Sequence, residues 1–201
     1  QDASRGQTMK ENLTEIILCV DRSGSMRSIA VDMEGGLRQL VADQSAPPGE
    51  CIVTYVTFDG EYEVEFVARP AAEVAADALR LRPRGSTALL DAMGRTIDDA
   101  LARHAAMGEA KPGKVLLAVI TDGQENASRT YTRDQVFKLV EGRREAGWEV
   151  MFIGANQDAI AVGATLGVAA ASTISYLSTS SGVEGMSAKL STRAMSYRSG
   201  S

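Results

Sequence analysis

The residues best suited to chemistry follow directly on an apolar run, residues 16–20. They are Asp21, Ser23 and Ser25, which place one carboxylate and two hydroxyls close together in the chain. Hard oxygen ligands of this kind suit a divalent cation such as Mg²⁺. Aspartate and serine also cap helices, so the same short pattern fits a simple helix start. Taken alone, this loop leaves both interpretations open.

Two further loops carry oxygen ligands. Asp122 follows a second apolar run, residues 115–120, and Thr87 lies just ahead of a helix predicted to begin near Leu89. In a doubly wound sheet the two apolar runs are neighbouring strands at the topological switch point, so both aspartates lie at one edge. A helix cap explains each loop separately, but loops that converge on one crevice favour a single site. The predicted metal ligands are Asp21, Ser23, Ser25, Thr87 and Asp122.

Composition limits the metal and the partner. One histidine and two cysteines are too few for a typical structural zinc site, so any metal is expected to be held by oxygen. The net charge of −5 argues against a nucleic-acid-binding surface, which requires a basic stripe.

The same totals indicate the class of protein. A chain of 201 residues suffices for one well-packed domain and is short for two. No apolar run reaches the roughly 20 residues that cross a bilayer, and the N-terminus shows no secretory pattern. We therefore expect no membrane association and a cytoplasmic location. Residues 1–12 are expected to be a disordered leader or a cloning remnant, residues 13–196 a single domain, and residues 197–201 a frayed tail.

The two cysteines are expected to be free thiols. Cys19 lies near the end of its predicted strand, whereas Cys51 lies just ahead of the next one. In parallel neighbouring strands they are offset by about five residues, or roughly 17 Å. A disulfide requires Cα atoms within about 7 Å of each other. Free thiols suit a cytoplasmic protein.

Short apolar runs alternate with helical patterns along the chain. Strands are predicted at residues 16–20, 52–58, 115–120, 148–153 and 173–176. Helices are predicted at residues 29–41, 71–81, 89–101 and 132–143, around Gly163, and at 183–195. Asp59-Gly60 predicts a two-residue hairpin turn, and strict alternation over residues 61–66 predicts an antiparallel edge strand whose glutamates face solvent. The expected fold is α/β: a doubly wound, Rossmann-like, mostly parallel six-stranded sheet with one antiparallel edge strand and helices on both faces.

Three stretches resemble the pieces of a metal-ion-dependent adhesion site (MIDAS): Asp21-Arg22-Ser23-Gly24-Ser25, Gly85-Ser86-Thr87 and Thr121-Asp122-Gly123. The chain from Thr14 to about Ser196 therefore resembles von Willebrand factor type A (vWA) domains, and residues 85–92 and 121–126 are most similar to intracellular bacterial or phage-type members. The resemblance implies that Ser23 and Ser25 bind the metal directly and that both aspartates act through water. It also implies that Thr87 binds directly or through water, depending on conformational state.

The resemblance implies a metal-dependent protein-interaction module rather than an enzyme. A partner's acidic residue would complete the coordination of Mg²⁺ or Mn²⁺. The strand ends suggest a rim for that partner, formed by Met26, Arg27, Gly60, Ser86, Gln124, Glu125 and Asn156.

The alternative is a Mg²⁺-dependent phosphatase or phosphotransferase that uses Asp21 as nucleophile. Against it, no second aspartate stands two residues after Asp21, and no evident lysine follows a strand. A dinucleotide-binding fold is disfavoured because no Gly-x-Gly-x-x-Gly follows the first strand. The sequence identifies neither the partner nor the oligomeric state.

Overall fold

The structure is a computed structural model that describes residues 11–156 and 158–200. Most of the predicted leader, residues 1–10, lies outside the described residues. The strands are β1 (Leu13–Asp21), β2 (Glu50–Phe58), β3 (Tyr62–Pro70), β4 (Lys114–Thr121), β5 (Glu149–Ala155) and β6 (Thr173–Tyr176). They form a six-stranded sheet in the order β3-β2-β1-β4-β5-β6, in which β3 alone is antiparallel to its neighbour. The predicted doubly wound α/β sheet with an antiparallel edge strand is confirmed.

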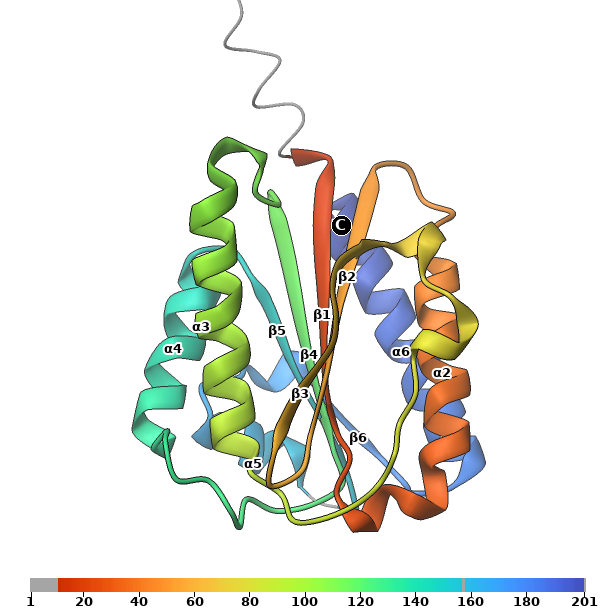
Figure 1. Ribbon diagram of the computed structural model, residues 1–201, viewed down its shortest axis with the longest axis vertical. Coiled ribbons are helices and arrows are strands. Elements are labelled where there is room, and N and C mark those ends of the chain that lie inside the picture. Colours follow the sequence, from red (N-terminus) through yellow and green to blue (C-terminus); the bar gives the residue numbers. More distant parts are fainter. Residues whose placement is uncertain (1–10, 157, 201) are drawn as a thin grey trace, which may run out of the picture.

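Helices cover both faces of this sheet (Figure 1). On one face, α2 (Ala30–Asp43) and α6 (Ser180–Ser199) pack over one apolar cluster. On the other, α3 (Leu89–Met107), α4 (Arg133–Glu145) and α5 (Ala159–Thr165) pack over a second cluster. β1 and β4 are buried along almost their whole length, because they lie in the middle of the sheet with helices on both sides.

Strand register places the carboxyl ends of β1 and β4 side by side. Ile16 pairs with Leu116 and Val20 with Ile120, so Asp21 and Asp122 leave the sheet at the same edge. Between β1 and β2, Cys51 pairs with Thr14, well removed from Cys19. Both cysteines are buried and free, as predicted.

The helix predicted over residues 71–81 is wrong. This stretch forms two short 3-10 turns, Ala71–Glu73 and Ala76–Ala78, joined by extended chain. Leu79 and Leu81 are both buried whereas Arg80 between them is exposed, an alternation typical of non-helical backbone. Arg80, which lies between them, is fixed by a long-range contact: the Tyr55 hydroxyl donates to the Arg80 carbonyl at 2.6 Å. Tertiary contacts therefore override the helical propensity of an alanine-rich stretch.

Two predicted boundaries also change. The hairpin after β2 has three connecting residues, since Phe58 pairs with Tyr62, instead of the predicted two. The predicted frayed tail is wrong up to Ser199, where α6 ends. Lys114 Nζ donates to the carbonyls of Tyr197 and Arg198 at 3.2 and 2.7 Å, which anchors the last turn.

Gly36 of α2 allows close packing between α2 and α6. A Cβ atom on Gly36 would lie 2.1 Å from the Ser187 hydroxyl of α6, so only glycine permits this approach. No helix of the described residues is both long and apolar enough to cross a membrane.

Candidate metal centre

Asp21 ends β1 and forms the base of the candidate site. It is fully buried, at 0% exposure. One carboxylate oxygen accepts the Ser23 backbone N–H at 2.6 Å, and the other accepts the Thr121 hydroxyl at 2.7 Å. Both oxygens are thus oriented by neutral donors from the two central strand ends. Thr121 was not among the predicted site residues.

The two serines face each other and the second aspartate. Ser23 Oγ lies 3.1 Å from Ser25 Oγ, and Ser25 Oγ donates to an Asp122 carboxylate oxygen at 2.7 Å. A 3-10 helix, Gly24–Ile29, follows β1, and Ser23 is its N-cap residue, yet the Ser23 side chain makes no capping hydrogen bond. The helix-cap interpretation of this loop is therefore wrong, and its hydroxyls point to the same place as Asp122.

Thr87 completes the group. Its hydroxyl lies 3.2 Å from the position that a Cβ on Gly123 would take, and an Asp21 carboxylate oxygen lies 3.8 Å from the same point. Thr87 is buried and caps nothing, because the N-cap of α3 is Ala88 and carries no side-chain cap. The structure therefore brings together all five predicted ligands, from three separate loops.

A clamp from the β4–α4 loop holds Thr87. The Asn126 side-chain oxygen accepts the Thr87 N–H at 2.9 Å, and the Asn126 N–H donates to the Thr87 carbonyl at 3.0 Å. Sequence reasoning missed Asn126, which has no signature beyond its place in the loop after Asp122. The clamp ties the Thr87 loop to the loop that carries Asp122.

The same loop caps α3 from outside the helix. The Glu125 carboxylate accepts the N–H of Leu89 at 3.1 Å and that of Ser128 at 2.7 Å. Ser128 Oγ in turn accepts the Asp91 N–H at 3.0 Å. Glu125 therefore satisfies the first turn of α3. It is partly exposed, and its place on the predicted rim stays a prediction.

The remaining predicted rim is only partly at the surface. Met26 is fully buried, at 0% exposure, so its place on the rim is wrong. The other predicted rim positions are exposed: Arg27, Gly60, Ser86, Gln124 and Asn156.

The electrostatics of the site fit a bound cation. Burial raises the pKa of Asp21, and the nearby charge of Asp122 raises it further, although hydrogen bonds from Ser23 and Thr121 oppose this. Burial also raises the pKa of Asp122. Within residues 11–156 and 158–200, no basic side chain forms an ion pair with either aspartate. Two carboxylates that lack a cation of their own, next to three hydroxyls, are the donor set of a hard divalent metal.

Within the described part of the chain, no group of three or more His, Cys, Asp or Glu residues is arranged to hold a metal. The buried Tyr176 hydroxyl has no hydrogen-bond partner among the described residues, and its pKa is raised by burial and by the charges of Asp122 and Asp21. Its O–H is thus an unused donor that the charges of both aspartates influence.

The sheet order and the helices on both faces define the class of fold: a doubly wound α/β domain of the vWA type. The sequence matches no protein-family model and no curated protein. Among solved structures, the chain resembles proximal thread matrix protein 1 (PTMP1) of the mussel byssus with zinc in its MIDAS motif, at 16% identity and a TM-score of 0.67, covering 92% of this chain and 46% of that one.

Two bacterial proteins are similar in the same way. The pilus adhesin SpaC of Lactobacillus rhamnosus GG matches at 15% identity and a TM-score of 0.68, over 92% of this chain and 31% of that chain. A von Willebrand factor type A protein from Catenulispora acidiphila matches at 14% identity and a TM-score of 0.62, over 92% and 43%. This chain therefore spans less than half the length of each of these proteins. The likeness shows that the fold is the vWA fold.

Proposed function

We propose that this protein is a metal-dependent protein-interaction module, in which Mg²⁺ or Mn²⁺ bound at the five-residue site accepts a carboxylate from a partner protein. The observation that carries the proposal is the convergence of Asp21, Ser23, Ser25, Thr87 and Asp122. Their only other apparent role, helix capping, is absent at both Ser23 and Thr87.

The donor set favours magnesium or manganese over zinc. Hydroxyl and carboxylate oxygens are hard ligands, whereas zinc prefers nitrogen and sulfur ligands. The PTMP1 structure shows zinc in the MIDAS motif of that protein. Zinc is therefore a necessary competitor in any test of metal identity.

The expected partner group is an anion. If the three neutral hydroxyls bind the ion directly and the two carboxylates act through water, no charged group contacts the ion itself, so a carboxylate from outside is a suitable further ligand where the ion faces solvent. The exposed Arg27 belongs to the same 3-10 helix as Ser25 and adds positive charge at this edge. The names of two structural neighbours, a matrix protein and a pilus adhesin, support an interaction role.

The geometry disfavours the phosphotransfer alternative. Asp21 is fully buried, and hydrogen bonds to Ser23 and Thr121 occupy both of its oxygens. A nucleophile must reach its substrate, whereas this carboxylate is placed to orient neighbouring ligands. We therefore propose binding without turnover, in a cytoplasmic protein whose two buried thiols are free.

Titration calorimetry with MgCl₂, MnCl₂ and ZnCl₂ tests the site directly. We expect wild type to bind Mg²⁺ and Mn²⁺, and Ser23→Ala,Ser25→Ala to bind them at least about 10-fold more weakly. Ser28→Ala is the matched control, because Ser28 is an exposed serine of the same 3-10 helix outside the site. Equal Mg²⁺ affinity in the double variant and wild type would contradict the ligand assignment.

Partner capture tests the function. A partner isolated on immobilised protein in Mg²⁺ should be released by EDTA, should rebind when Mg²⁺ is restored, and should not bind Asp21→Ala. Replacing one acidic residue of the partner by its amide should abolish binding. A partner that remains bound in EDTA contacts another surface, and hydrolysis of p-nitrophenyl phosphate that requires Asp21 would support the enzyme instead.

A further inference from the structure

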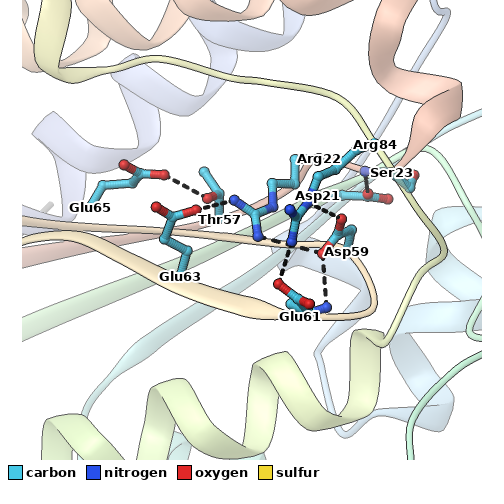
Figure 2. A network of polar contacts seen from close by, with 9 residues as sticks. All are labelled: Asp21, Arg22, Ser23, Thr57, Asp59, Glu61, Glu63, Glu65 and Arg84. Atoms are coloured by element: carbon cyan, nitrogen blue, oxygen red, sulfur yellow. Dashed lines mark hydrogen bonds and ion pairs between the residues drawn. The ribbon is translucent and has the colours of Figure 1, made fainter.

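A second strand-end aspartate, Asp59, lies at the same edge as Asp21 but is used differently. Asp59 follows β2 directly, and its side chain is 4% exposed. One carboxylate oxygen faces the Arg22 guanidinium at 3.5 Å, and the other accepts Arg84 Nε at 2.7 Å (Figure 2). Two arginines from separate loops therefore meet at one buried carboxylate that is not among the five candidate metal ligands.

The two arginines belong to the two halves of the metal site. Arg22 stands between the ligands Asp21 and Ser23, and Arg84 stands three positions before the ligand Thr87. Each arginine also reaches an acidic residue of the hairpin: Arg22 contacts Glu63, and Arg84 contacts Glu61 (Figure 2). The network therefore joins the β1 loop, the Thr87 loop and the β2–β3 hairpin.

We propose that Asp59 is a positioning residue that fixes the Ser23/Ser25 loop and the Thr87 loop at the separation that Mg²⁺ requires. This inference rests on the proposed function, because it assumes that the metal binds between those loops. Within the described structure, the Asp59 side chain forms no hydrogen bond or ion pair with the five ligand side chains, and it acts through Arg22 and Arg84.

Backbone contacts support the same reading, because they run along the same path. The Arg84 N–H donates to the Arg22 carbonyl at 2.7 Å, and the Ala88 N–H donates to the Asp59 carbonyl at 2.9 Å. The Asp59 side chain also accepts the Glu61 N–H at 2.8 Å, which fixes its own orientation. These contacts fix the orientation of the Asp59 carboxylate, so it can position Arg22 and Arg84.

A glycine makes the approach possible. Gly85 has a φ of +63°, and a Cβ there would lie 2.7 Å from an Asp59 carboxylate oxygen. The Thr87 loop can therefore close onto Asp59 only because position 85 has no side chain. Both the positive φ and the close approach to Asp59 favour glycine at position 85.

Small displacements are expected to matter, because Mg²⁺ demands near-octahedral geometry with oxygen ligands at about 2.0–2.1 Å. Residues that orient metal ligands typically change affinity by about 10–100-fold when they are removed. Arg22 is buried with Asp59, at 6% side-chain exposure, whereas the Arg84 side chain is 51% exposed. Removing Arg84 should therefore disturb the position of the Thr87 loop while costing little stability.

The chain offers a matched control for Arg84. Arg80 belongs to the same connecting segment, and its side chain is 53% exposed, but it pairs with Asp77 within its own turn. Arg84→Gln and Arg80→Gln therefore remove equally exposed charges, of which only one reaches Asp59.

The experiment measures Mg²⁺ affinity by calorimetry and the melting temperature in EDTA and in Mg²⁺, for wild type, Asp59→Asn, Arg84→Gln, Arg80→Gln and Asp59→Asn,Arg84→Gln. We expect Asp59→Asn to weaken Mg²⁺ binding about 10–100-fold, and Arg84→Gln to weaken it by a smaller factor. Arg80→Gln should match wild type. The double variant should match Asp59→Asn, because both changes break the same link.

A purely structural role for Asp59 would lower the melting temperature in EDTA while leaving the Mg²⁺ dissociation constant unchanged, and that result overturns the inference. Equal weakening of Mg²⁺ binding by Arg84→Gln and Arg80→Gln also overturns the inference. If Asp59→Asn fails to fold, the comparison of these two exposed variants decides the question. Wild type that binds neither Mg²⁺ nor Mn²⁺ overturns the proposed function and this inference with it. Wild type that binds Mg²⁺ while Asp59→Asn and Arg84→Gln bind equally well overturns this inference alone.

Discussion

Strand β1 carries two fully buried carboxylates, Glu15 near its start and Asp21 at its end, and they are treated in opposite ways. Glu15 accepts two hydrogen bonds from the Arg103 guanidinium, at 2.6 and 2.8 Å, one contact from His104 Nε2 at 2.8 Å, and one from the Thr54 hydroxyl at 2.8 Å. Among the described residues, Asp21 accepts hydrogen bonds only from uncharged donors, the Ser23 backbone N–H and the Thr121 hydroxyl.

The pKa values follow the donors. Burial alone would raise the pKa of Glu15, but hydrogen bonds from His104, Arg103 and Thr54 and the charge of Arg103 outweigh it, so the pKa is lowered. For Asp21 burial prevails and the pKa is raised. Within residues 11–156 and 158–200, a basic side chain therefore pairs with Glu15, and none pairs with Asp21. The first acts as a lock between β1 and α3, whereas the second has its charge available for an ion from outside.

The largest expected effect is the difference between removing Glu15 and removing Asp21, measured as the change in the free energy of unfolding. In EDTA, Glu15→Ala should lower the free energy of unfolding by about 3 kcal/mol, because it leaves Arg103 and His104 without their buried partner. This value is at the low end for a buried pair because the Arg103 side chain is 22% exposed. Asp21→Asn in EDTA should leave the free energy unchanged or raise it, because it removes a charge that burial disfavours. Urea unfolding measures both.

The control for Glu15 is Glu149→Ala, which removes another arginine-paired carboxylate, bound to Arg193 at 2.8 Å and partly exposed. It should cost no more than about 1 kcal/mol. If Asp21→Asn proved as destabilising in EDTA as Glu15→Ala, both carboxylates would be structural and the contrast would fail.

The second expected difference between the carboxylates is the pH at which each one's contribution is lost. The pKa of Asp21 and that of Asp122 are raised above the ordinary 3.8, so both take up protons at higher pH than in the unfolded chain. Because metal ligands must be ionised, Mg²⁺ affinity should fall as pH drops towards these raised values. Without metal, the same uptake favours the folded state, so these two groups add stability as pH falls.

Glu15 behaves in the reverse sense. Its pKa lies below the ordinary 4.5, so its contribution is fully present above that value and is lost only as pH falls through the lowered pKa. Melting curves from pH 7 to 4 should therefore lose the Mg²⁺-induced rise in melting temperature before the EDTA curve shows loss of the Glu15 lock. Simultaneous loss of both would contradict the assignment.

Glu125 is intermediate between Glu15 and Asp21 in the partners of its carboxylate, and its removal is expected to have the smallest effect on stability. Its carboxylate meets no cation in the described structure but accepts the N–H groups of Leu89 and Ser128, the first of which opens α3. Glu125→Ala should lower the free energy of unfolding by about 1 kcal/mol, as the loss of a helix cap does. Mg²⁺ affinity should fall only slightly, because the Asn126 clamp on Thr87 remains. Urea unfolding and calorimetry on the same variant separate the two effects, and an unchanged unfolding free energy would contradict the cap.

The sequence predicts the centre of this molecule better than its periphery. β1 and β4 are continuous apolar runs, and each ends in an aspartate, so their places and the meeting of Asp21 with Asp122 follow from topology alone. Ser23, Ser25 and Thr87 were identifiable because they are hydroxyls at fixed positions in those loops. Predicting that these five side chains meet therefore needed no knowledge of side-chain packing.

The supporting residues were beyond such reasoning. Asp59-Gly60 has the pattern of a turn, and nothing local indicates that Asp59 collects two arginines from distant loops. Residues 71–81 look helical because alanines dominate, but contacts with Tyr55 and Glu34, far away in sequence, hold the backbone extended. Glu125 and Met26 stand near the right edge, yet their burial and partners depend on which way each side chain points. Orientation and long-range contacts are set by packing, which no local pattern encodes.

The direction of β1 has a mechanical consequence. The amino end of β1 lies at the end of the sheet opposite the candidate metal centre (Figure 1). There, Leu13 and the last turn of α6 lie close to the start of β4. A partner held at Asp21 and a tether attached beside Leu13 would pull on the two ends of one strand. That load would run along β1, in shear against the parallel ladders to β2 and β4 on either side. In this geometry many hydrogen bonds must yield together instead of one after another, so the strand that carries the site is also the one best placed to bear tension.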